Sequence, residues 1–113
     1  MSIPTLLLVD DEPEILNLLK RNIRNWAATH DIQVIAEASA KDALRRIQSG
    51  EHEINILVTD QQMPGQKGSE LINSVRKENP DTVPIVLTGY TSPADIEKLL
   101  NNDVFAYLSL IHI

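Results

Sequence analysis

Three aspartates and one threonine in this 113-residue sequence each follow a short apolar run: Asp10, Asp11, Asp60 and Thr88. Carboxylate oxygens without a nearby histidine or cysteine favour a hard cation, Mg²⁺ or Mn²⁺, over zinc or copper. Crowded carboxylates also repel one another, so the pKa of one should rise unless a cation lies among them. If the fold brings these side chains together, the sequence predicts a magnesium site.

A magnesium ion held by only a few protein oxygens leaves room for a phosphoryl group. One of the aspartates could then attack phosphorus, because carboxylates act as covalent nucleophiles in phosphoryl transfer. The hydroxyl of Thr88 could donate a hydrogen bond to the phosphoryl group. Taken singly, each aspartate is better explained as a turn or helix-capping residue. Their recurrence at the ends of several apolar runs favours the functional interpretation.

The elements that must position these residues alternate between strand and helix. Short continuous apolar runs predict buried strands at 6–9, 34–36, 54–58, 83–87 and 104–108. Helical spacing of apolar residues and capping signals predict helices at about 13–28, from 40 to Gly50, through 71–75 before Pro80, and after Ser92. We expect Gly65 and Gly68 to lie in a tight loop between the third strand and the third helix.

An alternation of strands and helices predicts a parallel sheet with helices on both faces. The carboxyl ends of parallel strands meet at one edge of such a sheet, where binding sites form. Asp10, Asp11, Asp60 and Thr88 should therefore gather at this edge. The sequence alone leaves the order of the strands open.

The composition is that of one ordinary globular domain, with 42% apolar and 23% charged residues. Sixteen acidic against ten basic side chains leave a formal charge of −6, which argues against direct binding to nucleic acid. The chain has no cysteine, which excludes disulfides and thiolate metal sites. No apolar stretch approaches the ~20 residues needed to span a bilayer, and no signal peptide is recognisable. We expect a cytoplasmic protein that does not bind membranes.

Four sequence motifs strengthen this interpretation: Leu7–Glu12, Thr59–Gly65, Val86–Tyr90 and Phe105–Ser109. In this order and at these spacings, over residues 4–108, they resemble the motifs of response regulator receiver domains from two-component systems. The resemblance implies an α/β fold of the flavodoxin-like, doubly wound type. Its five-stranded parallel sheet would have the strand order 2-1-3-4-5.

The resemblance also implies a role for each site residue. Asp60 would accept a phosphoryl group from a histidine kinase or a histidine phosphotransfer protein. Asp60 and Thr88 would be the catalytic groups. Mg²⁺, for which Mn²⁺ could substitute, would be held by Asp10, Asp11, Asp60 and the backbone carbonyl of Gln62.

A receiver of this kind acts as a switch, and its only chemistry is its own phosphorylation and dephosphorylation. The resemblance implies that Thr88 and Tyr107 are the switch residues. They would change the surface formed by the fourth helix and the fifth strand. An output domain, fused or separate, would read that surface.

The sequence departs from the family pattern at Leu110, where receivers carry a lysine that pairs with the phosphoryl group. The final residues, Leu108–Ile113, match the translation of a transposase adaptor used to prepare sequencing libraries. We therefore interpret residues 1–109 as a receiver domain that lacks its last helix, and 110–113 as adaptor-derived rather than native.

Two alternatives to the phosphoacceptor function remain open. A degenerate receiver would act as an interaction module independently of phosphorylation, and a genuine Leu110 would favour this alternative. A phosphohydrolase of the haloacid-dehalogenase type would need a second aspartate two residues after its nucleophile. Gln62 occupies that position, which argues against the phosphohydrolase.

Overall fold

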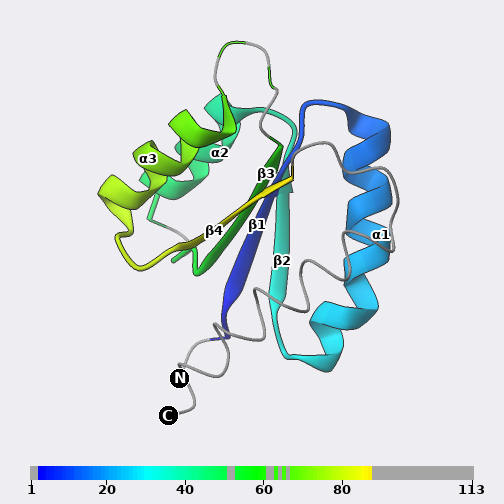
Figure 1. Ribbon diagram of the computed structural model, residues 1–113. Coiled ribbons are helices and arrows are strands. Elements are labelled where there is room, and N and C mark those ends of the chain that lie inside the picture. The colour runs from blue at the N-terminus through cyan, green and yellow to red at the C-terminus, as the bar shows by residue number, and fades with distance from the viewer. Residues whose placement is uncertain (1–2, 51–52, 61–62, 64, 66, 88–113) are drawn as a thin grey trace.

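The computed structural model describes residues 3–50, 53–60, 63, 65 and 67–87 of the chain (Figure 1). Strands and helices alternate along this part, as predicted. In chain order they are β1 (Thr5–Val9), α1 (Pro13–Thr29), β2 (Gln33–Glu37), α2 (Ala40–Gln48), β3 (Ile56–Asp60), α3 (Gly68–Glu78) and β4 (Val83–Leu87). The strand expected at 104–108 and the helix expected after Ser92 lie outside the described residues.

The strands form a parallel sheet with the order β2-β1-β3-β4. This order confirms the flavodoxin-like, doubly wound arrangement for the four strands that the structure describes. Helix α1 covers one face of the sheet, and α2 and α3 cover the other (Figure 1). The central strands β1 and β3 are thus buried on both faces, which explains why their sequences are continuous apolar runs.

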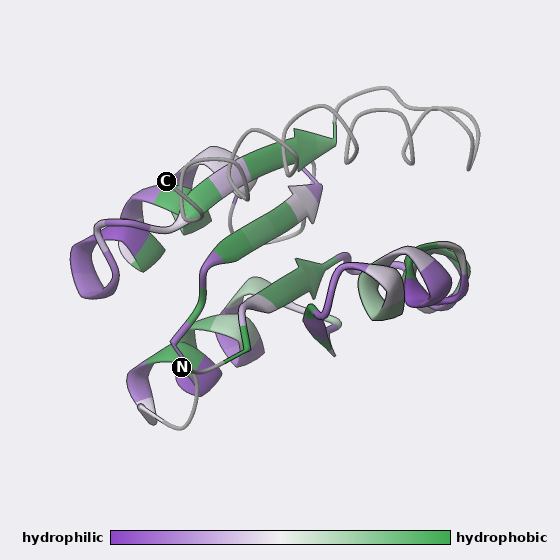
Figure 2. Cartoon of the chain, turned by 90° about the horizontal axis from the view of Figure 1, so that it is seen from below, coloured by the Kyte–Doolittle hydropathy of each residue, from purple (hydrophilic) through white to green (hydrophobic). Residues whose placement is uncertain are grey.

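Alternate residues of β1 belong to two separate cores. Leu6 and Leu8 pack under α1, whereas Leu7 and Val9 pack against α2 and α3. All four side chains are at most 1% exposed. Figure 2 shows the strands coloured as hydrophobic over most of their length, while the helices carry both hydrophobic and hydrophilic residues. The two cores hold the sheet rigidly and leave its carboxyl edge free for polar side chains.

The start of the third strand was predicted wrongly. The apolar run predicts a strand at 54–58, but β3 extends from Ile56 to Asp60. Ile54 is only 1% exposed, so it belongs to the apolar run because it is buried, not because it pairs with a neighbouring strand. Asp60 is consequently the last residue of the strand and does not follow it.

The helix termini largely follow the predicted signals. Pro13 occupies the first turn of α1, and the hydroxyl of Ser39 caps α2 by accepting a hydrogen bond from the backbone N–H of Asp42 at 3.1 Å. Gly65 has a φ of +81°, as expected for a tight loop. Gly68 was predicted to lie in the same loop, but it begins α3 and is buried. Among the helices described, none is long and apolar enough to cross a bilayer.

Asn55 joins three strands at the amino edge of the sheet. Its side-chain Oδ1 accepts a hydrogen bond from the backbone N–H of Thr5 at 2.8 Å. Its backbone N–H donates to the carbonyl of Thr5 at 3.0 Å, and its carbonyl accepts from the N–H of Val83 at 2.9 Å. Asn55 therefore sets where β1, β3 and β4 begin to pair.

We predict that Asn55→Ala lowers the free energy of unfolding by about 1–2 kcal/mol, because the partly buried N–H of Thr5 loses its acceptor. Urea denaturation followed by circular dichroism measures the change. Asn73→Ala, on the exposed surface of α3, is the matched control and should change stability by less than about 0.5 kcal/mol. Equal effects of the two substitutions would contradict this role of Asn55.

Candidate metal and carboxylate site

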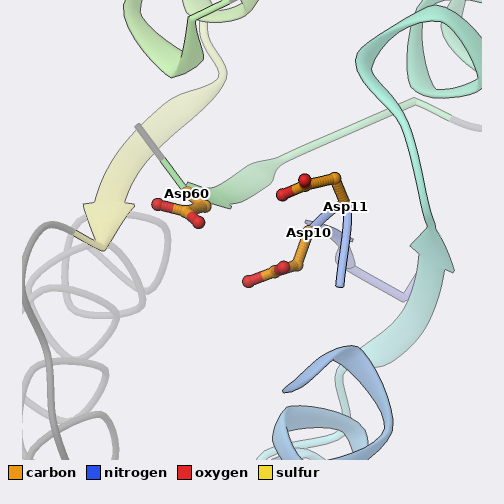
Figure 3. Close-up of side chains that lie close together, drawn as sticks. All are labelled: Asp10, Asp11 and Asp60. Atoms are coloured by element: carbon orange, nitrogen blue, oxygen red, sulfur yellow. The ribbon is translucent and has the colours of Figure 1, made fainter. Parts of the chain in front are cut away.

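Asp10, Asp11 and Asp60 come together at the carboxyl edge of the sheet. Strands β1 and β3 are paired with Val9 opposite Thr59, so the next residues, Asp10 and Asp60, lie side by side. One carboxylate oxygen from each of the three aspartates lies within 4.8 Å of the other two. Figure 3 shows the three side chains close together, with those of Asp10 and Asp11 extending toward Asp60. The predicted convergence of these aspartates is therefore present.

Asp10 is the most constrained of the three aspartates. It is 1% exposed, and its Oδ1 accepts a hydrogen bond from the backbone N–H of Glu12 at 2.9 Å. Its own N–H donates to the carbonyl of Glu37, the last residue of β2, at 3.3 Å. The carboxylate of Asp10 thus shapes the turn from β1 into α1.

The environment of Asp10 makes its charged form unfavourable. Burial is the main cause, and it raises the pKa of Asp10 from 3.8 to about 6. The hydrogen bond from the Glu12 N–H opposes this shift, while the charges of Asp60, Asp11 and Glu12 add to it. The predicted rise of one pKa in the cluster is therefore confirmed. The larger cause, however, is loss of water around Asp10 and not repulsion between the aspartates.

Asp11 shows that the cluster has capacity for a further ligand. Its Oδ1 is buried and has no hydrogen-bond partner within the part of the chain that the structure describes. A buried, unpartnered carboxylate oxygen is costly, and a bound cation would relieve this cost. The donor set of three carboxylates fits a hard divalent cation such as Mg²⁺. Separations of up to 4.8 Å between the carboxylate oxygens suit ligands that bind a cation directly or through a bound water.

Asp60 is more accessible than Asp10, because its side chain is only partly buried. Met63, three residues after Asp60, is 8% exposed and packs in the core beneath α2 and α3. The buried hydroxyl of Thr59 reaches both the backbone carbonyl of Asp60 at 3.0 Å and the sulfur of Met63 at 3.9 Å. The backbone at Asp60 is therefore fixed while its carboxylate remains reachable.

Three predicted site residues, Gln62, Thr88 and Tyr107, lie outside the described residues. Their roles stay predictions. The pairing of β3 with β4 nevertheless places Leu87, which immediately precedes Thr88 in the sequence, opposite Asp60.

Comparison with known proteins agrees with the resemblance that the sequence motifs indicate. The chain matches the family described as response regulator receiver domain over residues 6–109. It is 34% identical over 105 residues to the hydrogenase transcriptional regulatory protein HoxA of Cupriavidus necator. That match covers 92% of this chain but only 20% of HoxA, so the chain spans about a fifth of the length of this relative.

Solved structures extend the comparison to the fold. A two component transcriptional regulator AraC from Clostridium phytofermentans is 27% identical, with a TM-score of 0.82 over 96% of this chain and 98% of the other. The response regulator TrrA of Thermotoga maritima, solved in complex with Mg(2+)-BeF, is 30% identical. Its TM-score is 0.64 over 79% of this chain and 72% of TrrA.

We predict that the stability contributed by Asp10 falls as the pH rises. Because its pKa is higher in the folded than in the unfolded chain, this contribution is complete below about pH 4 and is lost as the pH passes about 6. Without divalent cations, the free energy of unfolding of Asp10→Asn should therefore rise by up to about 3 kcal/mol relative to that of the wild type between pH 4 and pH 7. Urea denaturation in EDTA at several pH values measures the difference. A difference that does not vary with pH would contradict the raised pKa.

Proposed function

Because the chain belongs to the response regulator receiver domain family, we propose that it is the phosphoacceptor switch of a two-component system. Asp60 accepts the phosphoryl group from a histidine kinase or a histidine phosphotransfer protein. The observation that carries this proposal is the convergence of the carboxylates of Asp10, Asp11 and Asp60 at one edge of the sheet. A cation site beside an accessible carboxylate is the arrangement that phosphoryl transfer to an aspartate requires.

The proposed ligands of Mg²⁺, or of Mn²⁺ in its place, are Asp10, Asp11, Asp60 and the backbone carbonyl of Gln62. When bound, the cation neutralises negative charge that would otherwise repel the phosphoryl oxygens from the carboxylates. The Asp11 oxygen that has no hydrogen-bond partner among the described residues supports this assignment. The similarity to TrrA, which was solved in complex with Mg(2+)-BeF, also supports it.

In the transfer step, a carboxylate oxygen of Asp60 attacks the phosphorus atom. The new O–P bond forms as the P–N bond to the donor histidine breaks, and the ring nitrogen of that histidine retains the bonding electron pair. The hydroxyl of Thr88 then donates a hydrogen bond to the new phosphoryl group.

The proposed consequence of phosphorylation is a change of surface and not the turnover of a substrate. Thr88 and Tyr107 rearrange, and the surface formed by the fourth helix and the fifth strand changes with them. An output domain, fused or separate, would read that change in the cytoplasm. The assignment of 1–109 to the receiver and of 110–113 to adaptor sequence remains part of this proposal.

The alternative of a phosphorylation-independent interaction module depends on Leu110 alone. The three aspartates give it no support, because a module without phosphoryl chemistry does not require a partly accessible carboxylate beside two others. The crowding of the aspartates carries an electrostatic cost that is most simply explained by function.

We predict that acetyl phosphate and Mg²⁺ add one phosphoryl group to the chain, and that Asp60→Asn removes this adduct. Intact mass spectrometry measures the added mass. Asp81→Asn, which changes an exposed aspartate at the opposite edge of the sheet, is the matched control and should be phosphorylated like the wild type. An unmodified wild-type chain, or an adduct that persists in Asp60→Asn, would overturn the proposal.

We also predict that Mg²⁺ raises the midpoint of thermal unfolding in proportion to the logarithm of its concentration once the site is saturated, because the cation binds only the folded cluster. Asp11→Asn should require an at least about tenfold higher Mg²⁺ concentration to reach the same rise in the midpoint. Glu14→Gln, an exposed change in the first turn of α1, should leave the response intact. Differential scanning fluorimetry measures all three proteins, and equal responses would exclude Asp11 as a ligand.

A further inference from the structure

An ion pair between Glu37 and Arg46 lies close to the aspartates in the fold, although neither residue belongs to the proposed phosphoryl-transfer chemistry. The Nε and Nη2 atoms of Arg46 both donate to Oε1 of Glu37, at 2.8 and 2.5 Å. The two side chains are only 31% and 19% exposed. Charge-assisted hydrogen bonds with this degree of burial hold their partners in a defined geometry.

The pair connects α2 to the strand end that supports Asp10. Glu37 is the last residue of β2, and its backbone carbonyl accepts the hydrogen bond from the N–H of Asp10 at 3.3 Å. Asp10 directly follows β1, so this hydrogen bond lies at the carboxyl end of the pairing of β1 with β2, and it is long for an N–H···O bond. The end of a strand separates readily from its neighbour unless something else holds it. The guanidinium of Arg46 holds the end of β2 in place by binding the carboxylate of Glu37.

Arg46 can act as a support because its own helix is fixed. Helix α2 is anchored in the core by Ala40, Ala43 and Ile47, which are at most 6% exposed. A second ion pair on α2, between Arg45 and Asp42, differs in every relevant respect. Its atoms are 3.7 Å apart, its side chains are 68% and 49% exposed, and both of its members belong to the helix. It therefore contributes little.

We propose that Glu37 and Arg46 form a positioning pair for the cation site, an inference that rests on the proposed function. The pair keeps the end of β2 against β1, so that the Asp10 N–H stays bonded and the three carboxylates keep the spacing that a cation needs. Neither side chain contacts the cation or the phosphoryl group. Their effect is exerted through the backbone of Asp10, as outer-shell residues orient the ligands of many metal sites.

A pair of charge-neutral double variants tests this inference. Removing Arg46 alone would also change the electrostatic field at the aspartates, whereas Glu37→Gln with Arg46→Met removes one charge of each sign. Asp42→Asn with Arg45→Met removes the exposed pair of the same helix in the same way, and serves as the matched control. Both variants keep the net charge of −6.

Mg²⁺ titration of the full chain, followed by NMR of the backbone amides, should show about fivefold weaker binding in the Glu37/Arg46 variant. This is below the roughly 10–100-fold losses seen where an outer-shell group touches a ligand atom. The control variant should bind within about twofold of the wild type. Without Mg²⁺, the amide of Asp10 should exchange with solvent about tenfold faster in the Glu37/Arg46 variant, while the amide of Val58 in β3 should not change.

The outcomes separate this inference from the proposed function. If the wild type binds Mg²⁺ and the Glu37/Arg46 variant binds it equally well, the positioning role is wrong and the proposed function stands. If both double variants weaken binding equally, the loss follows from any such change on α2 and not from the Glu37/Arg46 pair, and the inference is also wrong. If the wild type does not bind Mg²⁺, the proposed function is wrong, and faster exchange of Asp10 would still establish the structural tie.

Discussion

The parallel pairing of β1 with β3 is the constraint on which the site depends. With Val9 opposite Thr59, the residues that follow place Asp10 beside Asp60. A slip of one residue would turn the apolar side chains of β1 toward the wrong cores and would move the aspartates to opposite faces. The two hydrophobic cores therefore specify the register, and the register specifies the spacing of the carboxylates. The stability of the fold and the geometry of the site have the same origin.

This arrangement places an unfavourable negative charge at the end of β1, the strand whose side chains fill both cores. Asp10 is almost fully buried and its pKa is raised to about 6, so near neutral pH its ionised form opposes folding. Asp11 adds a buried oxygen without a hydrogen-bond partner among the described residues. Flanking side chains such as Leu8 and Leu57, at most 1% exposed, offset these costs through apolar burial. Sites with such costs persist where a ligand or a reaction makes use of them.

Much of the architecture and the location of the site could be predicted from the sequence, because both depend on local patterns. Apolar runs that end at aspartates imply buried parallel strands, and parallel strands imply a common carboxyl edge. What escaped prediction depends on tertiary contacts. Ile54 is apolar because it is buried before β3 begins, and apolarity alone does not distinguish these cases. Glu37 and Arg46 are nine residues apart on different elements, so no helical or strand periodicity marks them as partners.

The same electrostatics link cation binding to conformation. The cost of bringing Asp10, Asp11 and Asp60 together is present only when the strand ends are held side by side. A cation that removes this cost must, by linkage, bind more weakly to any conformation in which the carboxylates are separated. The reverse also holds, because a contact that keeps the strand ends together raises the affinity of the cluster for the cation. An interaction that bears on the end of β2, on Glu37 or on α2 would therefore act on the chemistry proposed at Asp60 without contacting that residue.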